Sequence, residues 1–302
     1  MTERMPALSL AAAPGRRART VQLAAQIEER GYSGIYCPSF GDALGLCLSI
    51  AHATSRIEFG TSIQPIYLQH PMALATTASY LHEISGGRFR LGVGVTHGPV
   101  VERLGVKTGK PLSDMREYVT TMRELGEQMG GLPPVILAAL RDKMVGLSIA
   151  VGDGAVWANA SRSRMPHSLS LVGNGSTADE FWIGNMIPTV IDDDLDAARA
   201  RNRKTLQGYV ALPNYRKYWS EAGYAAEMSA VADALDSRDS GAVLAAMSDR
   251  WLDDCTLSGS VERVRNGVDA WFDTGVTAPV LVPSSTSGGQ AKAFTEVFAA
   301  FE

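Results

Sequence analysis

Hydrophobic and polar positions along this chain follow two alternating patterns. Short apolar runs, such as residues 35–37 and 89–95, have the length and composition of buried strands. Between such runs, apolar residues recur at helical spacing, as Leu74, Ala78 and Leu81 do. Alternation of this kind predicts parallel βαβ units, whose ligand site lies at the carboxyl ends of the strands.

The pattern also gives approximate element boundaries. Thr20 is expected to cap a first helix, and Gly31 to close it. Residues 160–180, rich in Ser, Gly and Asn, are expected to form a loop or an insertion. Residues 195–252 are expected to be largely helical. This segment is longer than one crossover connection of a barrel, which indicates an inserted region. Strands are expected at residues 7–13, 35–37, 57–63, 89–95, 135–139, 155–158, 183–190 and 280–282, and further helices at 43–53, 71–84, 114–129, 143–151 and 291–301.

Composition narrows the class of protein. The chain has 302 residues, 45% hydrophobic and 20% charged, which is ordinary for a globular enzyme and fits one domain over residues 1–302. A net charge of −4 and the lack of a basic run give no reason to expect a nucleic-acid partner. No apolar run approaches the roughly 20 residues of a membrane span, and basic residues follow the apolar run 7–13 instead of preceding it. We therefore expect a cytoplasmic protein.

Metal binding is not expected from the residue pattern. The three cysteines, Cys37, Cys47 and Cys255, lack the spacing of metal ligands and are expected to be buried free thiols. The acidic run 192–194 is expected to begin a helix, where the helix dipole favours negative charge.

Residues 70–98 carry the most specific motifs. Pro71 fits the first position of a helix, Ser85-Gly86-Gly87-Arg88 ends that helix, and Leu91-Gly92-Val93-Gly94 ends the following strand. In this order and spacing the block resembles the luciferase-like monooxygenase family, particularly its deazaflavin (coenzyme F420)-dependent oxidoreductases. The resemblance implies a TIM barrel, an α/β fold, that binds coenzyme F420. It also implies a homodimer paired through the helices flanking strands two to four, with Tyr80 available for the contact.

The resemblance places cofactor contacts at four strand ends. After residues 57–63 it implies a cis peptide bond between Ser62 and Ile63, behind the ring. The turn at 138–144 is expected to receive the cofactor phosphate on backbone N–H groups, as a helix start does. The expected cofactor-binding residues are Ser39, Thr61, Ser62, Ile63, Gly94, Val95, Thr96, Ala139, Leu140, Arg141, Lys143, Met144 and Asn159.

Two neighbouring positions depart from the family pattern. Many deazaflavin-dependent relatives carry an acidic residue followed by His where this chain has Ser39 and Phe40. Asp42 can replace the acid from nearby, or it can simply form a turn beside Gly41. His97 appears where some relatives hold a carboxylic acid. Because histidine exchanges protons near neutral pH, His97 is the expected catalytic residue.

These features predict an enzyme that transfers a hydride between coenzyme F420 and a small organic substrate. A monooxygenase of the same fold that uses flavin mononucleotide (FMN) is one alternative. A non-catalytic F420-binding protein is the other, because the acid–His pair is missing.

Overall fold

The fold is a parallel α/β barrel, the TIM barrel that the sequence predicted. The computed structural model describes residues 4–39, 41–173 and 181–302. The chain divides into two compact units. One consists of Met5–Trp157 with Ser170–Gly184, and the other of Met1–Arg4, Ala158–Leu169 and Asn185–Glu302.

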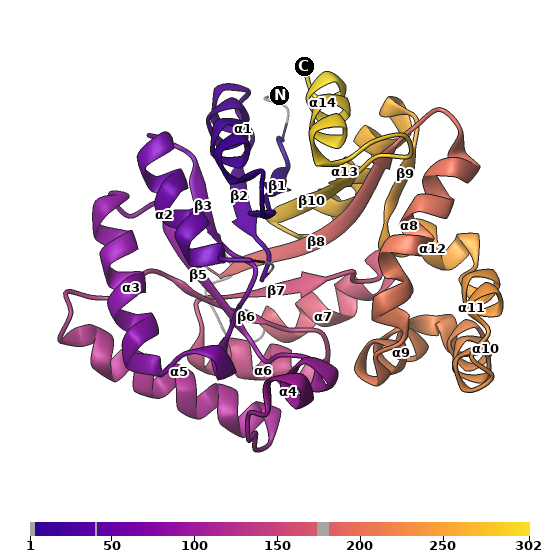
Figure 1. Ribbon diagram of the computed structural model, residues 1–302. Coiled ribbons are helices and arrows are strands. Elements are labelled where there is room, and N and C mark those ends of the chain that lie inside the picture. Colours follow the sequence, from indigo (N-terminus) through magenta and orange to yellow (C-terminus); the bar gives the residue numbers. More distant parts are fainter. Residues whose placement is uncertain (1–3, 40, 174–180) are drawn as a thin grey trace. The chain divides into compact units, whose positions relative to one another are not determined.

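The first unit contains the strands β1, β2, β3, β5, β6 and β7, which pair in that order and run parallel (Figure 1). The short strand β4 also pairs with β5. The strands are β1 (Ala7–Ser9), β2 (Gly34–Cys37), β3 (Glu58–Thr61), β4 (Gln64–Pro65), β5 (Phe89–Gly94), β6 (Val135–Ala138) and β7 (Gly154–Ala158). The helices between them are α1 (Arg17–Glu29), α2 (Ala43–Ala53), η1 (Ile66–Leu68), α3 (Pro71–Ile84), α4 (Gly98–Leu104), α5 (Pro111–Glu127) and α6 (Asp142–Val151).

The second unit is mostly helical, and in it β8 pairs with both β9 and β10. Its elements are η2 (Arg162–Arg164), α7 (Met165–Val172), β8 (Trp182–Ile191), α8 (Leu195–Val210), α9 (Pro213–Trp219), the π-helical turn η3 (Ser220–Tyr224), α10 (Ala225–Asp236), α11 (Ser240–Ala246), α12 (Asp249–Cys255), β9 (Leu257–Gly259), α13 (Val261–Asp273), β10 (Ala278–Ser284) and α14 (Gln290–Ala300). The last residues of α7, from Ser170 on, and the first residues of β8, up to Gly184, belong to the first unit.

Helix starts follow local chemistry in most places. Asp42 accepts a hydrogen bond from the Gly45 N–H at 2.9 Å and so caps α2, and Asp194 caps α8 in the same way through Ala197 at 3.0 Å. The expectation for Thr20 was wrong. Helix α1 begins at Arg17, and the Thr20 hydroxyl instead donates to the Arg16 carbonyl within the helix.

One other expectation needs correction, and two elements were not expected. Part of the segment 160–180, expected as a loop or insertion, forms η2 and α7, while residues 174–180 lie outside the described residues. Helix α4 follows directly after His97, and the strand β9 precedes α13; neither was expected. Polar composition obscured α7, because only Met165, Ser168 and Val172 are buried and one of these three is a serine.

The motif Ser85-Gly86-Gly87-Arg88 has a structural role in the first unit. Gly86 and Gly87 have φ values of 64° and 85°, which favour glycine and turn the chain out of α3. The Arg88 guanidinium then donates to the carbonyl oxygens of Ala51, Thr54, Ile57 and Ser85 and to the Thr54 hydroxyl. This one side chain therefore ties together the end of α2, the start of β3 and the end of α3.

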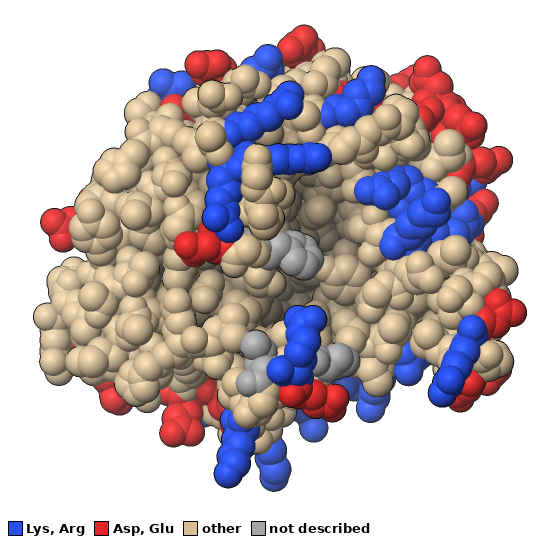
Figure 2. All heavy atoms as spheres, viewed as in Figure 1, with Lys and Arg blue, Asp and Glu red and all other residues tan. Residues whose placement is uncertain are grey.

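The surface carries both signs of charge. Figure 2 shows acidic and basic side chains in small separate groups with uncharged surface between them. Among the described residues, no helix combines the length and the apolar character that crossing a membrane requires. The three cysteines are buried free thiols, as expected.

Candidate active site

The predicted residues of the first unit gather at the carboxyl ends of β2, β3, β5 and β6. Because these strands are parallel neighbours, their carboxyl ends lie at one edge of the sheet. The peptide bond between Ser62 and Ile63 is cis, as the resemblance implied. The Ser62 N–H donates to the Cys37 carbonyl at 2.6 Å, which joins this segment to the end of β2.

The glycines of β5 make room for the neighbouring strand. A β-carbon on Gly92 would lie 2.0 Å from the Thr61 carbonyl oxygen, and one on Gly94 would lie 2.6 Å from Ile63 Cδ1. The Thr61 hydroxyl closes the same contact by donating to the Gly92 carbonyl at 2.7 Å. Ile63 itself remains half-exposed, so an apolar side chain stands at this edge over the end of β5.

Thr96 is a half-buried residue whose hydroxyl has an unmet hydrogen bond. Its Oγ1 atom is buried and has no hydrogen-bond partner among the described residues. A buried hydroxyl without a partner costs free energy. Thr96 follows β5 directly after Val95, at the edge where the cofactor was expected. Its orphaned oxygen fits a polar group of a bound ligand.

His97 stands at the junction between β5 and α4. Its backbone carbonyl accepts hydrogen bonds from Val100 and Val101, which holds the residue at the start of the helix. Burial lowers the pKa of the imidazole below its ordinary value. The ring is therefore neutral at pH 7 and can accept a proton.

The segment after β2 does not supply a second acid–base group among its described residues. Ser39 is exposed, and Asp42 has its carboxylate engaged as the cap of α2. The structure thus favours the simpler role for Asp42. Phe40 lies outside the described residues.

The turn after β6 leads straight into α6. The Ala139 N–H donates to the Val156 carbonyl at 2.9 Å, and Leu140 follows as a half-buried residue. Arg141 is the residue before the helix, and its carbonyl accepts from Met144 at 2.8 Å. Lys143 is exposed in the first turn. Asp142 lies between these two cations and partly offsets their charge toward an anion.

Asn159 belongs to the other unit. It has a φ of 58°, is buried, and its backbone is fixed by hydrogen bonds to Met186 and from Trp219. Its Nδ2 atom has no hydrogen-bond partner of normal geometry among the described residues, although its amide lies beside the Tyr209 hydroxyl. Burial raises the pKa of Tyr209, and this amide partly opposes that effect.

Sequence reasoning missed one pair near the strand ends. The Tyr67 hydroxyl, on η1 directly after β4, donates to Asp114 on α5 at 2.7 Å, and Asp114 also accepts from the Gly109 N–H at 2.7 Å. Burial and this carboxylate raise the pKa of Tyr67, so the phenol stays protonated. The partners are 47 positions apart, and no local signal links them.

A flat ligand bearing polar groups and an anionic end suits these residues. Ile63 offers an apolar surface, Thr96 an unsatisfied hydroxyl, and the start of α6 offers backbone N–H groups with the positive end of its dipole. Among the described residues, no group of His, Cys, Asp and Glu side chains could hold a metal ion.

The chain is similar in sequence or fold to proteins named as reductases and monooxygenases. The chain is 28% identical over 260 residues to a 5,10-methylenetetrahydromethanopterin reductase of Archaeoglobus fulgidus, covering 76% of this chain and 78% of the relative. Its structure resembles the coenzyme F420-dependent tetrahydromethanopterin reductase of Methanopyrus kandleri, with a TM-score of 0.74, 16% identity and 97% of both chains covered. It also resembles the oxygenating constituent of 3,6-diketocamphane monooxygenase of Pseudomonas putida in complex with FMN, with a TM-score of 0.66, 16% identity, and 98% and 96% covered. The model of the luciferase-like monooxygenase family matches residues 4–278. The chain therefore belongs to the luciferase-like monooxygenase family of oxidoreductases.

Proposed function

We propose that this protein is an F420-dependent oxidoreductase that transfers a hydride between the deazaflavin and a small organic substrate. The observation that carries the proposal is the Thr96 hydroxyl, buried and without a partner among the described residues, at the end of the glycine-containing strand β5. A cofactor group that accepts or donates a hydrogen bond there removes an existing energetic cost. The named F420-dependent relative of the same fold supports the choice of cofactor.

The residues then have separate tasks. Ser39, Thr61, Ser62, Ile63, Gly94 and Val95 form the edge against which the ring lies, and Thr96 contacts one of its polar groups. The turn Ala139, Leu140, Arg141, Lys143 and Met144 holds the phosphate. When bound, the deazaflavin accepts or supplies the hydride, and the protein positions the substrate against it.

His97 serves as the acid–base group. Its ring is neutral at pH 7 because burial lowers its pKa, so it can take the proton of a substrate hydroxyl as the hydride leaves the carbon. In the reverse direction the imidazolium returns that proton to the carbonyl oxygen being reduced. The phenol of Tyr67 does not compete for this role, since its pKa is raised and its proton is held by Asp114.

An FMN-dependent monooxygenase is the second candidate, supported by the FMN complex of the same fold. Two assays separate the candidates. A panel of small alcohols and carbonyl compounds is tested anaerobically with F420 or its reduced form, following the deazaflavin absorbance. Oxygen uptake is measured in parallel with chemically reduced FMN. Anaerobic F420 turnover supports the proposal, whereas substrate-dependent oxygen uptake with FMN and no F420 turnover contradicts it.

A further inference from the structure

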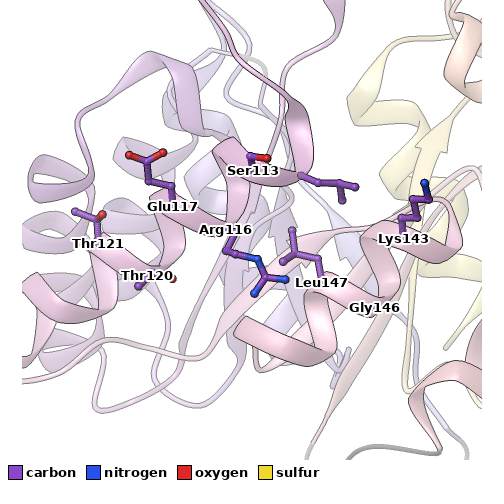
Figure 3. Close-up of a pocket in the computed structure, with 9 residues that line it drawn as sticks. Ser113, Arg116, Glu117, Thr120, Thr121, Lys143, Gly146 and Leu147 are labelled. Atoms are coloured by element: carbon purple, nitrogen blue, oxygen red, sulfur yellow. The ribbon is translucent and has the colours of Figure 1, made fainter.

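A groove separates helices α5 and α6 in the first unit. It has a volume of about 570 Å³, within the range of pockets that hold small organic molecules. Figure 3 shows its residues at helical spacing on the two helices, with Lys143 at the start of α6. The lining residues on α6 are Lys143, Gly146 and Leu147, and those on α5 are Leu112, Ser113, Arg116, Glu117, Thr120 and Thr121.

Two cationic side chains, Arg116 and Lys143, and one carboxylate, Glu117, line the groove. Neither Arg116 nor Lys143 forms an ion pair with another residue in the described part of the chain. Figure 3 shows the Arg116 guanidinium directed toward α6, beside Leu147. The Glu117 carboxylate, by contrast, points to the side of α5 away from α6. A cation beside an apolar side chain suits an organic anion.

Gly146 keeps the groove open. It lies inside α6, has an ordinary helical backbone, and a β-carbon there would meet no atom within 4 Å. Neither packing nor backbone conformation therefore requires glycine, which is a poor helix former compared with alanine. What the missing side chain does provide is space between the two helices.

We propose that this groove binds an organic anion, with a carboxylate or phosphate group at Arg116 and Lys143 and an apolar part against Leu112 and Leu147. The groove shares Lys143 with the turn at 139–144, and its other lining residues lie outside that turn. The inference therefore does not depend on which cofactor the enzyme uses.

The test measures binding of two probes, benzoate and phenyl phosphate, by ligand-observed NMR at low ionic strength. The two probes share the apolar ring and differ in the anionic group, so their relative affinity identifies the preferred chemistry. The variants are Arg116→Gln, which removes the charge, and Gly146→Met, which fills the groove. Gly146→Ala is the matched control for the backbone, and Arg201→Gln, an exposed residue of α8, is the control for net charge.

Saturable binding of at least one probe by the unaltered protein is expected. Arg116→Gln should weaken it about three- to tenfold, as loss of one partly exposed charged contact does. Gly146→Met should abolish it, whereas Gly146→Ala should keep it within about twofold and raise the melting temperature by roughly 1–3 °C. Arg201→Gln should leave binding unchanged.

Three results would overturn the proposal. The first is no saturable binding of either probe, and the second is binding by Arg116→Gln and Gly146→Met that equals that of the unaltered protein. The third is that Arg201→Gln weakens binding as much as Arg116→Gln does. Phosphate binding at the turn alone would appear as the second result, because neither substitution alters that turn. Failure of F420 to bind would contradict the proposed function and would leave this test intact.

Discussion

His97 is the residue on which the proposed chemistry depends. His97→Ala should lower turnover by about a hundred- to ten-thousand-fold, the usual contribution of a positioned acid–base group, and leave F420 affinity nearly unchanged. Because burial lowers the imidazole pKa, turnover that needs the neutral ring should persist at pH 7 and fall only below the ordinary histidine value of about 6.5. Steady-state rates against pH measure both effects. Full turnover in the variant would show that His97 does not take part in proton transfer. Loss of F420 binding would show that His97 instead contributes to the cofactor pocket.

Thr96 offers a test with two opposite readouts. Thr96→Val keeps the shape of the side chain and removes the hydroxyl that has no partner among the described residues. The free energy of unfolding without cofactor should therefore rise by about 1 kcal/mol, while F420 binding should weaken about three- to tenfold. Denaturant unfolding and fluorescence titration give the two values. Stability that falls would show that the hydroxyl already has a partner in the protein without cofactor. Affinity that does not change would show that the hydroxyl does not contact F420.

At the scale of elements, Arg88 joins three segments of the first unit through its bonds to backbone carbonyls. Arg88→Ala would leave the carbonyls of Ala51, Thr54 and Ile57 without this donor and should lower the free energy of unfolding by about 2–4 kcal/mol. Urea denaturation measures the change. Arg88→Lys keeps the charge but has fewer donors in fixed directions. Its free energy of unfolding should therefore lie between those of the unaltered protein and Arg88→Ala. A loss below about 0.5 kcal/mol in the alanine variant would contradict this role.

Elements whose signals are local could be predicted from the sequence. The helix start at Asp194 and the glycines that end α3 each act within a few residues of their own position. Helix α7 could not be predicted, since its buried face is short and its serines resemble a loop. The Tyr67–Asp114 contact and the unsatisfied Thr96 hydroxyl depend on segments far apart in the sequence, so only the folded chain reveals them.

For the whole molecule, the outer helices of the first unit carry exposed apolar side chains. Met72 and Tyr80 on α3 are 50% and 53% exposed, and Leu48 on α2 and Leu68 on η1 are also exposed. Apolar and aromatic residues of this kind are enriched in protein interfaces. We therefore predict a homodimer formed through α2 and α3, which light scattering should detect and Tyr80→Glu should weaken. A mass of 32.2 kDa at micromolar concentration would contradict it.

We propose that the strand ends of this barrel bind coenzyme F420 in preference to FMN. Fluorescence titration of the purified protein with each cofactor, under the same buffer conditions, tests it directly. We expect saturable quenching of F420 fluorescence in the micromolar range, at least tenfold tighter than any binding of FMN, corresponding to about 1.4 kcal/mol. Tighter binding of FMN, or no saturable binding of F420, would contradict it.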